Sequence, residues 1–137
     1  MVMSLEAAAE RAARQMLLAV DPDHGGRTSR GSYREAYVIL ALEEAGQLVG
    51  PVTRRPERGH GDCTDANGQD WDVKGYYDDG RRPQFDVAVC LEDIRWEVGC
   101  GEKVIMDLEG VTDPANRLAL HQAVDAAGLG DHVRWYE

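Results

Sequence analysis

Charged side chains are unusually dense in one short stretch of the chain, GHGDCTDANGQDWDVKG, which runs from Gly59 to Gly75. The dipeptide Asn67-Gly68 predicts a tight hairpin turn, because both residues tolerate the positive φ that such turns demand. Strands that pack into a core prefer β-branched and aromatic residues. The aspartates and the lysine of this hairpin therefore need a reason beyond packing.

The register of the hairpin decides which charges meet. With a three-residue loop at 66–68, Asp62 lies opposite Asp72, and both share one sheet face with Lys74. Cys63, Trp71 and Val73 then occupy the other face, which has the composition of a core. A two-residue loop would pair Asp62 with Val73 instead and would loosen the carboxylate cluster.

Two carboxylates that face each other repel unless a positive charge lies between them. A divalent cation fits this need, since Mg²⁺ and Mn²⁺ prefer a few carboxylate oxygens together with water. A lysine beside such an ion can orient an attacking water and stabilise the charge that develops on a phosphoryl group. Asp62, Asp72 and Lys74 thus suggest phosphoryl chemistry, although a solvated hairpin face neutralised by Lys74 is the simpler alternative.

The second predicted helix carries a further acid. Glu35, Ile39 and Leu42 follow helical spacing, so Glu35 lies at the end of an apolar stripe, where a carboxylate is costly unless it is paired or bound to a metal. It is a candidate third ligand, or it pairs with Arg34 or with an arginine of the preceding loop.

A run of basic residues precedes the hairpin. Arg54, Arg55, Arg58 and His60 could contact substrate phosphates, which would position a nucleic-acid backbone without reading its bases. Arginines at a solvated strand edge and a bystander histidine are the structural alternative.

Hydrophobic periodicity and capping residues predict the elements that position these side chains. We expect helices that begin near Ser4 and at Ser32, then a strand near residues 48–55 and the two strands of the hairpin. Alternating helices and strands follow. We expect a helix from about Asp86 to Gly99, a buried strand KVIMDL, a helix in TDPANRLALHQAVDAAG and a final strand HVRWY. This order predicts an α/β or α+β sheet flanked by helices.

Length and charge set the outer limits. The chain has 137 residues, 43% of them apolar, and a formal charge of −10, which argues against a nucleic-acid coat or membrane-surface protein. No apolar stretch is long enough to cross a bilayer, so no membrane partner is expected. Three cysteines without paired spacing indicate reduced thiols and a cytoplasmic site of action.

The constellation of Glu35 on a helix, Asp62 on one strand and Asp72-Val73-Lys74 on the next resembles the PD-(D/E)xK superfamily of restriction-endonuclease-like nucleases. From about Ser32 to Glu137, the motifs GQDWDVKG, GEKVIMDLEGV and AVDAAGLGDHVRWYE also resemble nuclease-type C-terminal domains of bacterial polymorphic toxins. Many members of the superfamily have Glu at the position of Asp72 and Pro at the position of Gly61.

The resemblance implies a restriction-endonuclease-like αβββαβ core with a mixed central sheet and an extra N-terminal helix. It implies one nuclease-like domain over residues 1–137, with a helix and loop at 1–31 and the core at 32–137. Asp62, Asp72 and Glu35 would hold the metal, and Lys74 would act on the water. The activity would be that of an Mg²⁺-dependent endonuclease.

The implied partners follow from this activity. DNA is the favoured substrate and RNA stays open, a cognate immunity protein is expected, and the domain could be delivered as part of a secreted effector. The alternative is a non-catalytic acidic binding module, because residues 83–137 hold eleven acids and four bases. Such an acidic surface would suit a basic protein partner.

Overall fold

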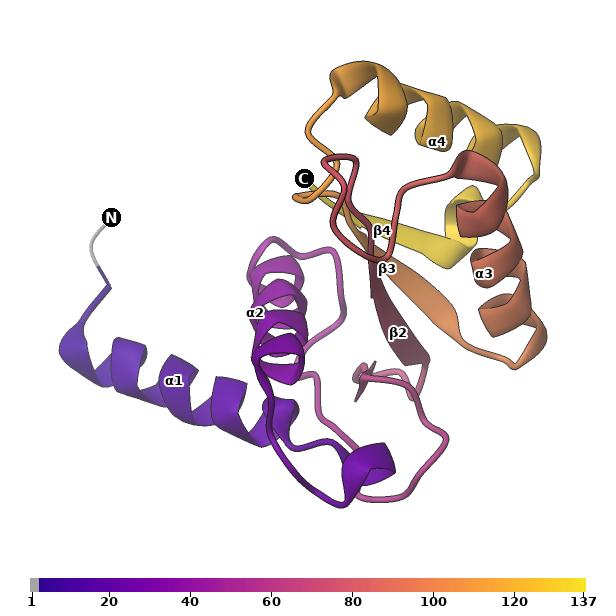
Figure 1. Ribbon diagram of the computed structural model, residues 1–137. Coiled ribbons are helices and arrows are strands. Elements are labelled where there is room, and N and C mark those ends of the chain that lie inside the picture. Colours follow the sequence, from indigo (N-terminus) through magenta and orange to yellow (C-terminus); the bar gives the residue numbers. More distant parts are fainter. Residues whose placement is uncertain (1–2) are drawn as a thin grey trace. The chain divides into compact units, whose positions relative to one another are not determined.

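The computed structural model describes residues 3–137 and divides the chain into two compact units, Met1–Gly68 and Gln69–Glu137. The described residues form four α-helices and four β-strands, which confirms the α+β class (Figure 1). Strand pairing is antiparallel in the first unit and parallel in the second. The expectation of a single folding domain over the whole chain stays a prediction.

Two 15-residue helices dominate the first unit: α1, Leu5–Ala19, and α2, Arg30–Glu44. Ser4 caps α1 as predicted, because its side chain accepts a hydrogen bond from the Ala7 amide. The two helices are joined by a bidentate ion pair between Arg14 and Glu43, with N–O distances of 2.5 and 2.6 Å. A short 3₁₀ turn, Pro22–His24, lies between the helices.

The start of α2 corrects one expectation. Ser29 is the N-cap and Ser32 the third helical residue, so the helix begins before the predicted capping position. The Ser29 hydroxyl accepts from the Ser32 amide, and the Ser32 hydroxyl accepts from the Ser29 amide. This reciprocal capping box satisfies two amides that the helix itself leaves open.

The predicted strand at residues 48–55 is wrong. This segment forms only an isolated antiparallel bridge, in which Thr53 and Thr64 exchange both backbone hydrogen bonds. The Val52 amide donates to the Glu43 carboxylate instead of to a neighbouring strand. Strand β1, Cys63–Thr64, follows, so one strand of the expected αβββαβ order is missing.

The predicted hairpin turn is present. The Gly68 amide donates to the Asp65 carbonyl at 3.0 Å, and Gly68 has a φ of 83°, a left-handed value that favours glycine. The Asp65 carboxylate accepts from the Asn67 amide, which stabilises the turn locally. Asp65 is only 8% exposed.

The second unit is a β-α-β-α-β arrangement that matches the predicted elements. Strand β2, Asp70–Gly75, pairs in parallel with β3, Lys103–Asp107, and β3 pairs in parallel with β4, Val133–Tyr136. Helix α3, Val87–Gly99, and helix α4, Pro114–Ala126, make the two crossovers (Figure 1). Crossover helices are what parallel neighbours require.

Both helices cover the same face of this sheet. Val104 and Met106 of β3 belong to one buried cluster with side chains of both helices: Cys90, Ile94, Leu120 and Val124. Since paired residues of parallel strands point to the same side, Asp72 opposite Val104 and Lys74 opposite Met106 also lie on the helix-covered face.

Candidate functional site

The two charged residues predicted on β2 lie together. Lys74 Nζ is 2.8 Å from Asp72 Oδ2, and the two side chains are 20% and 21% exposed. Residues two apart on a strand project to the same face, which is why the D-x-K spacing brings these groups into contact. The structure thus confirms the shared face of Asp72 and Lys74.

A second acid also contacts the ammonium group of Lys74. Lys74 Nζ also donates to Glu97 Oε1 of α3 at 3.0 Å. Burial alone would lower the pKa of Lys74, but the charges and hydrogen bonds of Asp72 and Glu97 outweigh it and raise that pKa. The lysine is therefore a fixed cation and not a base at neutral pH.

Glu102, directly before β3, joins the same group. Its burial, a hydrogen bond with Glu97 and the charges of Asp72 and Asp70 raise the pKa of Glu102 to about 8. Its Oε1 atom is buried and has no hydrogen-bond partner in the described part of the chain. Lys74 with Asp72, Glu97 and Glu102 is called the Lys74 cluster below.

Sequence reasoning missed Glu97 and Glu102. Neither residue belongs to a sequence motif with the D-x-K tripeptide, because Glu97 lies in α3 and Glu102 in the loop after it. Only the parallel register, in which Trp71 is opposite Lys103, brings the start of β3 beside β2. Glu97 lies beside the apolar stripe of its helix, and a charge at that position was the one sequence signal for a functional role.

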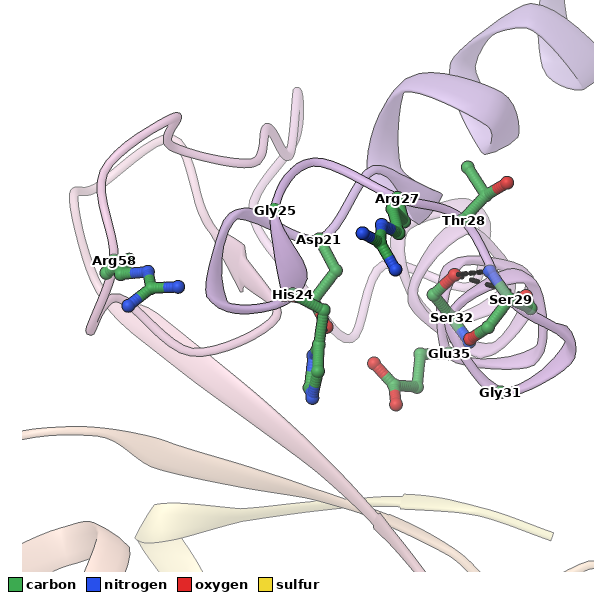
Figure 2. A pocket seen from close by; sticks show the side chains of 10 residues that line it. All are labelled: Asp21, His24, Gly25, Arg27, Thr28, Ser29, Gly31, Ser32, Glu35 and Arg58. Atoms are coloured by element: carbon green, nitrogen blue, oxygen red, sulfur yellow. Dashed lines mark hydrogen bonds and ion pairs between the residues drawn. The ribbon is translucent and has the colours of Figure 1, made fainter.

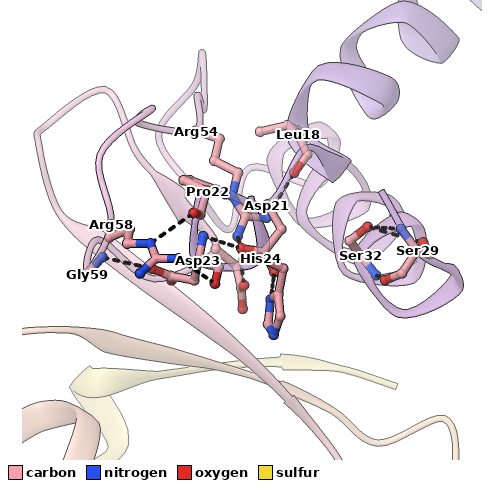
Figure 3. Close-up of polar contacts among 11 residues, drawn as sticks. Leu18, Asp21, Pro22, Asp23, His24, Ser29, Ser32, Arg54, Arg58 and Gly59 are labelled. Carbon is pink, nitrogen blue, oxygen red and sulfur yellow. Dashed lines mark hydrogen bonds and ion pairs between the residues drawn. The ribbon is translucent and has the colours of Figure 1, made fainter. Parts of the chain in front are cut away.

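Asp62 belongs to the first unit, where Arg54 lies close to it. Arg54 Nη2 is 3.6 Å from Asp62 Oδ1 and 3.1 Å from Asp21 Oδ1, and Arg54 also donates to the Leu18 carbonyl (Figure 3). The Arg54 side chain is only 5% exposed. Arg54 thus holds the end of α1 to the loop that follows it, and a role in phosphate contact stays a prediction.

Two further basic residues predicted as phosphate contacts lie in the same unit. Arg55 is 3.3 Å from His60 Nδ1 through its Nη1 atom. Arg58 donates to the Pro22 and Asp23 carbonyls at 3.3 and 3.4 Å (Figure 3). Arg55 thus contacts a ring nitrogen, and Arg58 contacts backbone oxygens.

Glu35 lies on α2 and lines a cavity of about 600 Å³ together with Arg58 (Figure 2). Glu35 is half-buried, as its place at the end of the apolar stripe predicts. Within residues 3–137, no group of three or more His, Cys, Asp or Glu side chains is arranged to hold a metal ion. The carboxylate oxygens of the Lys74 cluster are nevertheless hard donors of the type that Mg²⁺ prefers.

Comparison of the chain with protein-family models, with curated proteins and with solved structures gives no match. Among the described residues, no helix has both the length and the apolarity that a membrane crossing requires.

Proposed function

We propose that the chain is a metal-dependent endonuclease of the restriction-endonuclease-like class, with DNA as the favoured substrate, acting as the toxic domain of a bacterial conflict system. One observation carries the proposal: Lys74 Nζ lies 2.8 Å from Asp72 Oδ2 on one face of β2, so a carboxylate that can bind a metal and a cation that can stabilise a phosphate lie side by side. The parallel strand that follows through a crossover helix supports the same class.

In this function Lys74 supplies a permanent positive charge. Asp72 and Glu97 hold its ammonium group in place, so it can donate a hydrogen bond to a phosphate oxygen or to the attacking water without reorganisation. Its raised pKa keeps it protonated, so it stabilises negative charge and does not remove a proton.

Asp72 supplies the hard oxygen ligand of the proposed site. A bound Mg²⁺ or Mn²⁺ ion would polarise the scissile phosphodiester. The resemblance assigns Asp62 and Glu35 of the first unit as additional ligands, and both assignments stay predictions. Glu97 and Glu102 have the same ligand chemistry and belong to the second unit.

A nicking assay on supercoiled plasmid, with Mg²⁺ and Mn²⁺ titrations and a parallel RNA substrate, tests this function. We expect cleavage that EDTA abolishes and that Asp72→Asn and Lys74→Gln each reduce by about 100-fold or more. Lys103→Gln, the other lysine of the chain, and Asp131→Asn are the matched controls and should keep full activity. Cleavage that persists in both the Asp72 and Lys74 variants would refute the mechanism.

A non-catalytic acidic binding module is the second candidate. It is favoured by the second unit, which holds fifteen acids and seven bases, and by Trp96 of α3, which is 71% exposed. A large exposed aromatic beside acidic side chains suits a basic protein partner. Calorimetry with Mn²⁺ separates the two candidates: metal binding that Asp72→Asn removes favours the nuclease, and its absence favours the binding module.

A further inference from the structure

The cavity of about 600 Å³ that Glu35 lines lies wholly in the first unit, between the loop after α1, the start of α2 and Arg58. Its volume falls in the range of small-molecule sites, roughly 300–1,000 Å³. Figure 2 shows the side chains of Arg27 and Glu35 extending into the same space, with His24 beside them.

The two arginines of the cavity differ from the paired arginines of the chain. Arg11, Arg14, Arg54 and Arg81 each have a carboxylate partner. Among residues 3–137, no carboxylate lies within ion-pair distance of the Arg27 or Arg58 guanidinium. In a chain with 25 acids and 15 bases, two such arginines in one cavity are a ready site for an anion.

The local backbone adds to this preference. The cavity includes Ser29 and Gly31 at the N-terminal end of α2, a 15-residue helix whose dipole places partial positive charge there. The planar guanidinium fork matches phosphate oxygens better than a point charge does. Phosphate is therefore the anion that these groups recognise best.

Two other lining residues suit the rest of a nucleotide. The His24 side chain is 79% exposed, and its Nδ1 atom lies 2.6 Å from Asp21 Oδ2, so its ring offers a face on which a base can stack (Figure 3). The Glu35 carboxylate can accept a hydrogen bond from an exocyclic amine of the base.

We propose that this cavity binds one nucleoside monophosphate unit of a nucleic-acid chain, with its phosphate on Arg27. The choice of a nucleotide over other phosphorylated ligands rests on the proposed nuclease function. The site would hold a nucleotide of the substrate and would not itself perform chemistry.

Calorimetric titration of the full chain with AMP, adenosine and inorganic phosphate, in EDTA and in the Asp72→Asn background, tests the proposal. We expect saturable AMP binding that is tighter than binding of phosphate or adenosine alone. Arg27→Gln should weaken it by about fivefold or more, because one charged contact is lost. Arg30→Gln, a neighbouring arginine that does not line the cavity, should change it less than about twofold.

Each other result has a definite meaning. Absence of AMP binding, equal binding of inorganic phosphate, or an equal loss in Arg30→Gln would overturn the nucleotide site. Arg58→Gln removes hydrogen bonds to two backbone carbonyls and could disturb the loop, so Arg27→Gln, which removes none, is the deciding variant. Because binding is measured without metal, its failure is distinguishable from failure of the nuclease, which the plasmid assay reports.

Discussion

The two units use cations in opposite ways. In the second unit Lys74 is enclosed by acids, with Asp72 and Glu97 at 2.8 and 3.0 Å and Glu102 beside them. In the first unit Arg27 and Arg58 line an open cavity, and neither has an acidic partner within residues 3–137. The local balance of charge explains this difference: the first unit contains ten acids and eight bases, and the second contains fifteen acids and seven bases.

The difference indicates where binding energy is available. A cation already held by two carboxylates is positioned, and those carboxylates compensate its charge before a ligand arrives. An exposed guanidinium without a partner loses only its water when an anion binds. The Lys74 cluster thus fixes the position of a cation, whereas the arginines of the cavity can bind an anionic ligand.

The largest expected effect on stability comes from Lys74→Met. Removal of the ammonium leaves Asp72 and Glu97 close together and only 21% and 14% exposed, so we expect unfolding free energy to fall by about 2–3 kcal/mol. Urea denaturation at pH 7 measures it. Arg27→Met is the contrasting variant, and an equal loss there would remove the distinction between the two units.

Glu102→Gln tests whether the Lys74 cluster makes folding stability depend on pH. The pKa of Glu102 is raised in the folded state from 4.5 to about 8, so in this window the unfolded chain releases a proton that the folded chain keeps. Folding stability therefore falls as pH rises, by up to about 1.4 kcal/mol per pH unit. This loss of folding stability is complete above about pH 8 and absent below pH 4.5.

Denaturation of wild type and Glu102→Gln in EDTA at pH 5, 6.5 and 8 isolates this contribution as the difference between the two proteins. The variant should gain stability relative to wild type as pH increases. If the stability difference between the two proteins does not change with pH, the pKa of Glu102 is not raised by folding.

Ser29→Ala probes the rim of the cavity. The variant loses the hydroxyl that accepts from the Ser32 amide, and we expect a cost of about 1 kcal/mol. Thr28→Ala, the neighbouring residue on the cavity wall, is the control and should change stability by less than about 0.5 kcal/mol. Equal costs at the two positions would mean that the capping box does not stabilise α2.

The smallest effect is expected for Arg27→Met. No carboxylate partner is lost in this exposed position, so stability should stay within about 0.5 kcal/mol of wild type. Thermal denaturation monitored by circular dichroism is sufficient to measure it. A clear gain in stability would indicate that repulsion among the basic residues of the first unit is significant.

Local signals determined much of this protein. Ser4 is the N-cap that the sequence predicted, and the helix expected from about Asp86 begins after Asp86 as its N-cap. Gly68 has the left-handed φ that the Asn67-Gly68 turn requires. These features depend on a few neighbouring residues, so sequence alone specifies them. The alternation along β2 also determined that Asp72 and Lys74 share a face.

Tertiary structure decided the rest. The segment at 48–55 has the composition of a strand, but the Glu43 carboxylate takes its Val52 amide, and only one bridge forms. Glu97 and Glu102 reach Lys74 only because parallel pairing and a crossover helix bring distant residues to one face. Contacts between residues far apart in the chain depend on register and packing, which no local spacing encodes.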